Sequence, residues 1–227
     1  MSDVNDARRP LVVELIGPAG AGKSAVAERL CAHADVVRAS VWNLPPGLVL
    51  ESAVRSLPLL FLFCCQARTV PRETLKQIIR LNALYLFVQR RVGHARLVVL
   101  DEGPVFALSW LMVFGHPRLQ DGRVEAWRRQ TYSAWATALD RLVTLKATAP
   151  ILTARIRKRR KDDDVFRRMT GPQVLDVIAR YGEAVDRVLS GFVTAGAAAP
   201  LELAAADASP ERLSQIVLAT LEGSARG

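Results

Sequence analysis

Gly17-Pro18-Ala19-Gly20-Ala21-Gly22-Lys23-Ser24 is the stretch that decides the fold of this chain. It follows the apolar run of residues 11–16 and leads into a helix-like run, so it joins a predicted strand to a predicted helix. Glycines let the backbone wrap around an anion with successive N–H groups pointing inward, and the following helix directs its positive end there. The stretch therefore predicts an anion cradle for the phosphates of a nucleotide.

The stretch fits the pattern G-x-x-x-x-G-K-[ST] at every fixed position. In this pattern the lysine, here Lys23, reaches the β- and γ-phosphates, and the hydroxyl of Ser24 coordinates Mg²⁺. We therefore expect ATP and Mg²⁺ as cofactors, against the alternative of a glycine-rich turn in another α/β protein. The expected nucleotide contacts are Gly17, Ala19, Gly20, Ala21, Gly22, Lys23, Ser24 and Ala25.

Length and composition indicate one α/β domain over residues 11–227, with a disordered tail over residues 1–10. The net charge is +9, but residues 155–168 alone hold eight Lys or Arg against three Asp. Because a basic segment over a phosphate site explains this excess, nucleic acid is disfavoured as a partner. The longest uncharged run spans fifteen residues, 103–117, which is too short for a bilayer. Three cysteines without disulfide or metal spacing favour a cytoplasmic protein.

Apolar runs of strand length alternate with helical stretches along the chain. The expected strands are residues 11–16, 35–41, 97–101, 141–147 and 200–205. Continuous rather than alternating hydrophobicity is typical of buried parallel strands, so the pattern predicts a three-layer α/β fold with a parallel sheet of about five strands. The run at residues 57–65 (LPLLFLFCC) is apolar on all sides. It predicts either a central core helix or a helix that also packs on a second subunit.

Two acids follow the predicted strand at residues 97–100. Ligands bind outside the carboxyl ends of parallel strands, so Asp101 is placed to hold Mg²⁺ or to accept a proton as a base. The alternative is a carboxylate that caps the next helix. Glu102 is a weaker candidate for the same chemistry. Glu14, inside the first buried strand, is expected to pair with a base or to face the acceptor cleft.

In layout the chain resembles the P-loop nucleoside and nucleotide kinases, and most of all thymidylate kinase-like proteins. The resemblance rests on the phosphate loop, the apolar residues 60–63, the strand that ends in Asp101, and residues 149–159 (APILTARIRKR), all in the family's order. It covers residues 11–221, and only the phosphate loop is sharply specific. It implies a P-loop NTPase fold with a basic lid over about residues 155–170, whose arginines close over the transferred phosphoryl group.

The resemblance also implies roles for single residues. Arg155 and Arg159 lie four apart and would share one helix face, where they would stabilise the transferring group. Asp207 and Ala208 fall in the loop that borders the adenine in this family. The family places an arginine directly after the strand acid, where this chain has Glu102. That departure puts the usual nucleoside acceptors in doubt and makes the pair Asp101-Glu102 similar to that of P-loop ATPases.

The sequence thus predicts a kinase that moves the γ-phosphoryl group of ATP to a small-molecule hydroxyl or phosphate, with a nucleoside or nucleotide as the favoured acceptor. A P-loop ATPase or nucleotide switch acting on a protein partner is the main alternative, and a nucleotide-binding protein without catalysis is a third. Trp42 and Asn43 are candidates for the acceptor site, whereas Trp110, Trp127 and Trp135 favour the core. A homodimer through the apolar helices at about residues 48–66 and 72–92 is also expected.

Overall fold

The computed structural model describes residues 9–66, 71–90, 95–115, 122–158, 169–206 and 208–224. Its centre is a parallel sheet in the order β2-β3-β1-β4-β5. The strands are β1 (Leu11–Ile16), β2 (Val36–Ala39), β3 (Leu97–Asp101), β4 (Arg141–Lys146) and β5 (Leu201–Ala204). The predicted α/β class is confirmed, and all five expected strands are present within one or two residues of their predicted bounds.

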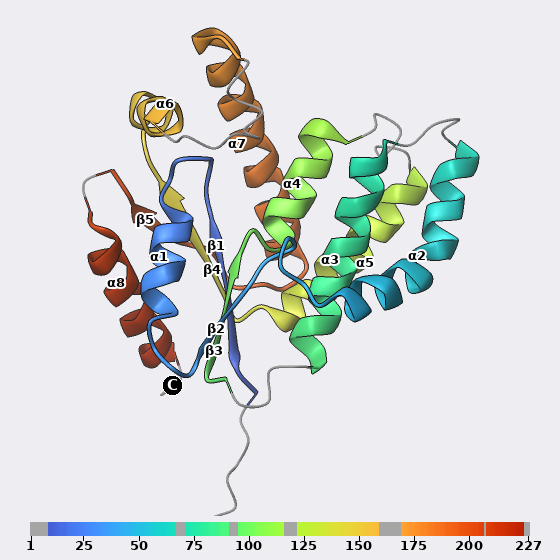
Figure 1. Cartoon of the computed structure of the whole chain (residues 1–227), viewed down its shortest axis with the longest axis horizontal. Helices are drawn as coiled ribbons and strands as arrows, with labels where there is room; N and C mark the ends of the chain where they lie inside the picture. The colour runs from blue at the N-terminus through green and yellow to red at the C-terminus, as the bar shows by residue number, and fades with distance from the viewer. Residues whose placement is uncertain are drawn as a thin grey trace, which may run out of the picture.

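Eight helices within the described ranges surround the sheet. They are α1 (Lys23–Leu30), α2 (Pro46–Gln66), α3 (Arg72–Arg90), α4 (Pro104–Phe114), α5 (Gly122–Ala138), α6 (Ala149–Lys158), α7 (Gly171–Thr194) and α8 (Pro210–Ser224). Figure 1 shows α1 and α8 on one side of the sheet and α3, α4, α5 and α7 on the other. The predicted three layers are therefore confirmed.

Alternation of side chains along β1 distributes the core between the two sides of the sheet. Val13 and Leu15 belong to the apolar cluster formed with α1 and α8. Val12 and Ile16 belong to the cluster on the other side, with α3, α4, α5 and α7. Glu14 shares the parity of Val12 and Ile16, so its carboxyl group points to the larger helical layer.

The order of the strands fixes where a ligand can bind. β1 has β3 on one side and β4 on the other, while the chain leaves β1 for β2 and later crosses from β3 to β4. The chain connections therefore diverge at β1, and in open α/β sheets this switch point opens a crevice at the carboxyl ends of the strands. The segment of residues 17–22 leaves β1 at that crevice.

The central-core interpretation of residues 57–65 is wrong for the outer side of α2. Leu57 is 58% exposed and Phe61 is 72% exposed. α2 packs against α3 and lies at the edge of the molecule, away from the sheet (Figure 1). Apolar composition alone predicts that a helix buries several faces, but it does not say whether the same chain supplies the cover.

Candidate active site

The loop between β1 and α1 has a backbone that requires glycine. Gly17, Gly20 and Gly22 have φ angles of 151°, 83° and 96°, in the region that other residues rarely adopt. A Cβ atom at Gly17 would lie 2.7 Å from the carbonyl oxygen of Leu145, so the loop approaches β4 too closely for any side chain there. Gly22 immediately precedes α1, and the loop thus ends at the positive end of that helix.

Lys23 places its charge within this loop. Its Nζ donates hydrogen bonds to the carbonyl oxygens of Gly17, at 2.7 Å, and Pro18, at 3.1 Å. Ser24 and Ala25 follow as the next residues of α1, and both are half-buried. The loop amides, the Lys23 ammonium and the first turn of α1 thus lie on one short stretch of chain, where an anion would meet all three.

Asp101 ends β3 next to Leu15 of β1, and it is 4% exposed. Its Oδ2 accepts a short hydrogen bond from Arg38 of β2, and Arg38 also lies 3.9 Å from Glu28. Its Oδ1 is buried and has no hydrogen-bond partner within the described part of the chain. A buried carboxylate oxygen without a donor suits a metal ion or a metal-bound water, and Ser24 offers the hydroxyl that a P-loop magnesium site uses.

Glu14 does not do what the sequence suggested, because it neither pairs with a base as its main contact nor opens onto a cleft. It is fully buried, and its carboxylate accepts hydrogen bonds from the backbone N–H groups of Val105, at 3.0 Å, and Phe106, at 3.1 Å. These are orphan donors at the start of α4, whose preceding residue Gly103 supplies no capping side chain. Glu14 therefore caps a helix ninety residues away in sequence.

Burial dominates the protonation of Glu14. It raises the pKa of this carboxyl to about 8, although the amides at the start of α4 and the charge of Lys23 act in the opposite direction. The pKa of Tyr181 on α7 is also raised. Burial is the main cause, and the charges of Glu14 and Glu102 add to it. A Cβ atom on Gly103 would come within 2.8 Å of the Glu14 carboxyl carbon, so the turn before α4 closes tightly on this group.

Glu102 occupies this turn in a backbone conformation that is uncommon for a residue with a side chain. Its φ is 68°, in the left-handed region. Its carbonyl oxygen accepts a hydrogen bond from the N–H of Val41, at 3.3 Å, which joins the turn to the loop after β2. The turn therefore links the carboxyl ends of β2 and β3 and lies directly after Asp101. Such strain is concentrated at functional sites.

Arg155 lies on α6, and its contacts are to backbone rather than to open space. Its guanidinium donates to the carbonyl oxygens of Gly20, at 3.3 Å, Ala205, at 3.2 Å, and Ala206, at 3.4 Å. Arg155 therefore connects the phosphate loop to the segment after β5, where Ala208 lies half-buried. Arg159, Asp207 and most of the expected lid lie outside the described residues.

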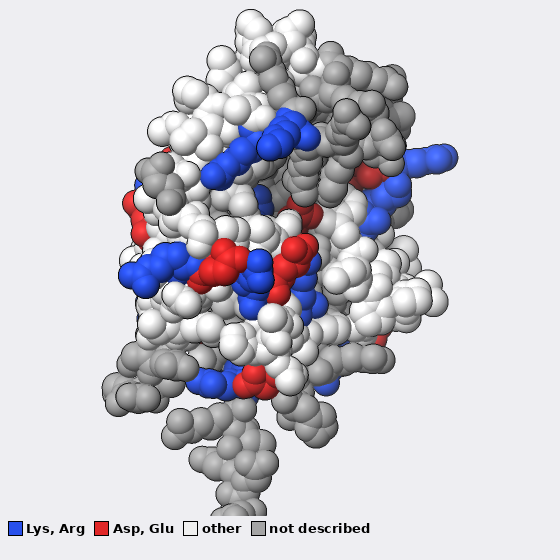
Figure 2. Space-filling view, turned by 60° about the vertical axis from the view of Figure 1, so that its left-hand side comes forward, with Lys and Arg blue, Asp and Glu red and all other residues white. Residues whose placement is uncertain are grey.

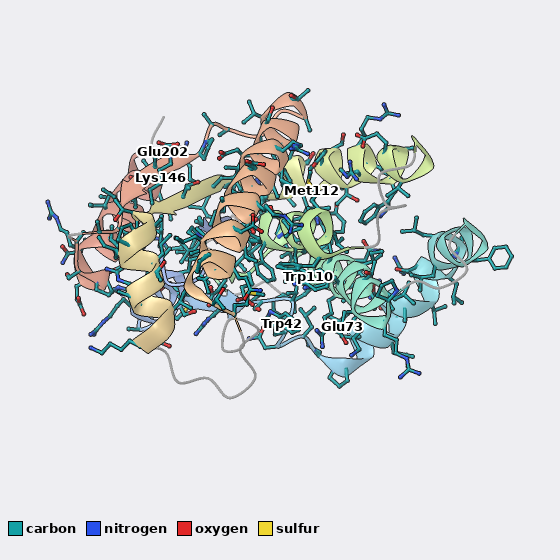
Figure 3. All side chains as sticks on the ribbon, turned by 90° about the horizontal axis from the view of Figure 1, so that it is seen from above. Trp42, Glu73, Trp110, Met112, Lys146 and Glu202 are labelled. Carbon is teal, nitrogen blue, oxygen red and sulfur yellow. The ribbon has the colours of Figure 1, made fainter. Side chains whose placement is uncertain are left out.

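The loop after β2 carries aromatic and polar residues. Trp42, in the loop after β2, is 51% exposed, and the guanidinium carbon of Arg80 lies 4.4 Å from the centre of its ring. Seen from above, Trp42 and Trp110 lie on the α3 and α4 side, away from α6 (Figure 3). Trp135 is buried in the core as predicted. Asn43 uses its carbonyl Oδ1 to accept the N–H of Ser40, at 2.8 Å, and so shapes this loop.

Among the described residues, three buried side chains on α3 and α4 have polar atoms without a hydrogen-bond partner. Gln77 is 2% exposed, and both its Nε2 and its Oε1 are without a hydrogen bond in the described structure. The hydroxyls of Thr74 and Ser109 are buried and unpaired in the same part of the structure. Gln77 lies one helical turn before Arg80, on the buried face of α3. Sequence reasoning missed these residues because glutamine and serine in a helix normally indicate a solvated face.

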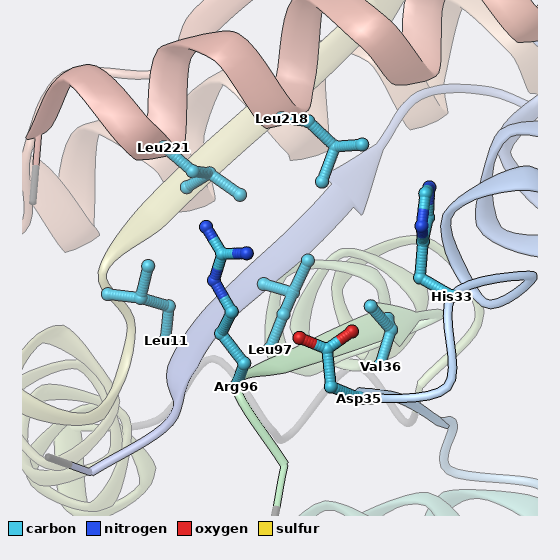
Figure 4. Close-up of a pocket in the computed structure, with 8 residues that line it drawn as sticks. All are labelled: Leu11, His33, Asp35, Val36, Arg96, Leu97, Leu218 and Leu221. Carbon is cyan, nitrogen blue, oxygen red and sulfur yellow. The ribbon is translucent and has the colours of Figure 1, made fainter.

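A separate cavity of about 140 Å³ lies at the opposite edge of the sheet (Figure 4). It is lined by the first residues of β1, β2 and β3, together with His33, Asp35 and Arg96 and two leucines of α8. Ligands in this class of fold bind at the carboxyl ends of the strands, whereas this cavity is at their amino ends. It shares no residue with the phosphate loop.

Comparison with known families agrees with this geometry. The profile of the AAA domain family matches residues 12–184. The chain belongs to the AAA domain family. The match begins in β1 and extends through the phosphate loop, Asp101 and the first half of α7, so it contains every described site element except the segment after β5. No curated protein sequence matches the chain.

Three solved structures, two of them kinases, share the fold over nearly the whole chain. The YorR protein from Bacillus subtilis, in complex with phosphorylated GDP, has a TM-score of 0.57 at 15% identity over 95% of this chain and 98% of its own. Deoxyadenosine kinase from M. mycoides has a TM-score of 0.54 at 14% identity over 94% of this chain and 100% of its own. Shikimate kinase from Bacteroides thetaiotaomicron has a TM-score of 0.53 at 15% identity over 93% of this chain and 98% of its own. The resemblance to P-loop kinases is therefore confirmed at the level of the fold.

The described surface carries acids and bases side by side. Figure 2 shows them intermixed on the face that carries α1 and α8, where Arg29 pairs with Glu211 at 2.5 Å. Further along, Lys146 pairs with Glu202 at 2.6 Å. Within the described ranges, every helix is too short or too polar to cross a bilayer.

Proposed function

We propose that this protein is an ATP-dependent phosphotransferase that moves the γ-phosphoryl group of ATP to a small-molecule hydroxyl or phosphate. One arrangement carries the proposal: the glycine-built loop with Lys23 stands beside a buried Asp101 whose Oδ1 has no partner in the described structure. Phosphoryl transfer needs positioning and charge neutralisation more than covalent chemistry, and these groups supply both.

The nucleotide roles follow from the positions of the side chains. The loop amides and Lys23 bind the phosphates, with Gly17, Ala19, Gly20, Ala21 and Gly22 as the backbone contacts. Mg²⁺, when bound, supplies neutralisation of phosphate charge. Ser24 and Asp101 would hold it, Asp101 through its buried Oδ1. Asp207 and Ala208 would border the adenine.

The remaining catalytic roles concern the acceptor hydroxyl and the transferring group. Asp101, a buried carboxylate at the end of β3, would accept the proton of the acceptor hydroxyl, and Glu102 follows it on the strained turn. Arg155 and Arg159 would stabilise the transferring group from the lid. The hydrogen bond from the Arg155 guanidinium to the carbonyl oxygen of Gly20 supports this role for Arg155.

The acceptor side is proposed to be the space between the loop after β2 and the helices α3 and α4. Trp42, with Arg80 on its ring, offers a flat stacking surface. The carboxamide of Gln77, which has no partner among the described residues, offers one hydrogen-bond acceptor and two hydrogen-bond donors. A planar substrate whose edge carries hydrogen-bond donors and acceptors could stack on Trp42 and bond to Gln77, which favours a nucleoside or nucleotide. Two structural neighbours were solved with phosphorylated GDP or with deoxynucleotide products bound.

A P-loop ATPase or nucleotide switch is the second candidate, and Glu102 favours it. An acid directly after Asp101 could position a hydrolytic water rather than an acceptor. Glu102→Gln distinguishes the two functions, because an ATPase should bind ATP and stop, whereas a kinase should lose less than tenfold in its turnover number. The measurement is single-turnover ADP formation with and without the acceptor.

The direct test is ADP release from Mg-ATP with a panel of nucleosides, nucleotides, sugars and hydroxylated antibiotics. A kinase should release ADP slowly alone and much faster with one acceptor class, with a phosphorylated product visible by mass spectrometry. Steady release that no acceptor changes would support the ATPase. We further propose a cytoplasmic location.

A further inference from the structure

α2 distributes its polar and apolar side chains in the opposite way to an ordinary surface helix. Its side towards α3 buries serines: Ser52 is fully buried and donates to the carbonyl oxygen of Ile79 at 2.6 Å, and Ser56 accepts from Asn82 at 2.9 Å. Its outer side carries large apolar residues. A surface helix normally places these two classes of residue the other way round, so the outer side of α2 is built for contact.

We call the outer residues Leu50, Val54, Leu57 and Phe61 the α2 stripe. They are 68%, 59%, 58% and 72% exposed, respectively. Their spacing of four, three and four residues keeps them on one side of a helix, within about 60° of arc. Four such side chains expose an apolar patch of the order of 400 Å², a size that is often functional on a monomer.

The stripe fits a second copy of itself. Positions 50, 54, 57 and 61 are symmetric about the midpoint between residues 55 and 56. An antiparallel copy would therefore set Leu50 against the partner's Phe61 and Val54 against the partner's Leu57. A two-fold interface must be self-complementary in this way, because both subunits present the same surface.

The size of the stripe agrees with a two-fold contact. A standard interface buries about 800 Å² on each partner, so the stripe is large enough for its apolar centre, and the polar flanks would supply the remainder. The flanking carboxylate of Glu51 is already paired within the chain, with Arg90 at 2.6 Å and Arg55 at 2.8 Å. These three side chains together keep one positive charge, so the apolar stripe rather than the charged flank carries the argument.

We propose that the α2 stripe binds a second copy of this chain in an antiparallel, two-fold dimer. The inference is independent of the phosphoryl-transfer assignment, since it uses no residue of the nucleotide site. The sequence predicted a dimer contact through both apolar helices, at about residues 48–66 and 72–92. The proposed contact uses only the outer side of α2, whose other side packs on α3.

The test is the mass of the full chain in solution, by light scattering across a range of protein concentrations. The wild type should have twice the chain mass of 24.9 kDa. Phe61→Glu and Leu57→Glu should return it to the single-chain mass, with a dissociation constant raised at least a hundredfold. Leu175→Glu and Val193→Glu, at residues of α7 that are 45% and 44% exposed, are the matched controls and should stay dimeric. Circular dichroism checks that all variants fold.

A second experiment tests the direction of the pairing. Val54→Lys alone and Leu57→Glu alone should be monomeric, and a mixture of the two should recover the dimer mass, because the antiparallel arrangement sets position 54 against position 57. A wild type that is monomeric at 100 μM, stripe variants that remain dimeric, or a mixture that recovers nothing would each overturn the proposal.

Discussion

The two proposed sides of the site are built in different ways. The proposed phosphate side is a single stretch, residues 17–24, with three positive φ angles and one lysine, in which backbone amides would be the main binding groups. The proposed acceptor side would combine the loop after β2 with α3 and α4, and it would rely on side chains such as Trp42 and Gln77. On this proposal the backbone binds what every nucleotide shares, whereas side chains choose one acceptor. Substitutions on the phosphate side should therefore abolish activity, whereas substitutions on the acceptor side should reduce it only in part.

The largest effect is expected on the phosphate side. Lys23→Ala should lower phosphoryl transfer by more than a thousandfold, because it removes the positive charge held in the loop. The melting temperature should stay within about 2 °C, since the glycine backbone keeps its shape. Lys146→Ala, at a 59% exposed lysine of β4, is the control and should retain activity. Wild-type-like turnover of the Lys23 variant would remove the basis for the kinase assignment.

The protonation of Glu14, the buried carboxyl that caps α4, should control how the free energy of unfolding depends on pH. Its pKa is raised from 4.5 to about 8, so the folded protein holds this proton more tightly than the unfolded chain. The stabilisation is therefore complete below about pH 4.5 and is lost as the pH rises towards 8. At about 1.4 kcal/mol per pKa unit, the loss is of the order of 5 kcal/mol.

Glu14→Gln should remove this component of the pH dependence. Urea unfolding at pH 5, 6.5 and 8 would give a flatter profile of unfolding free energy for the variant than for the wild type. Glu202→Gln, at an exposed carboxyl of β5, provides the control and should keep the wild-type slope. Parallel slopes for all three proteins would show that Glu14 does not titrate in this window.

Asp101 lies between the two sides and should give a smaller effect than Lys23. Asp101→Asn should reduce the turnover number about a hundredfold and raise the Mg²⁺ concentration needed for half-maximal activity, because a neutral amide holds a cation less well. Glu28→Gln removes the other carboxyl near Arg38, 3.9 Å away and 70% exposed, and should stay within threefold of wild type. Equal losses in the two variants would assign the effect to Arg38 instead.

The sequence could predict what depends on neighbours along the chain. The phosphate loop and the bounds of β1 and β3 follow from contiguous patterns, and the structure has those strands at the expected residues. The contacts of Glu14 could not be predicted, because its hydrogen-bond donors at residues 105 and 106 are about ninety positions away. The exposed side of α2 was equally inaccessible, since hydrophobicity does not record which molecule covers it. The roles of Arg155 and Arg159 stay predictions.

The acceptor side should show the smallest effect and the most diagnostic one, through Gln77. Gln77→Leu replaces a buried carboxamide that lacks partners in the described structure by an apolar group of similar size, so the protein should become about 1 kcal/mol more stable. If Gln77 binds the acceptor, the same variant should raise the acceptor KM about tenfold and leave the KM for ATP unchanged. Asn82→Leu, on the same helix, removes an amide that is paired with Ser56 and should do the reverse, lowering stability without changing either KM. A stabilised Gln77 variant with an unaltered acceptor KM would show that this amide is a packing defect, and the acceptor would then have to bind closer to Trp42.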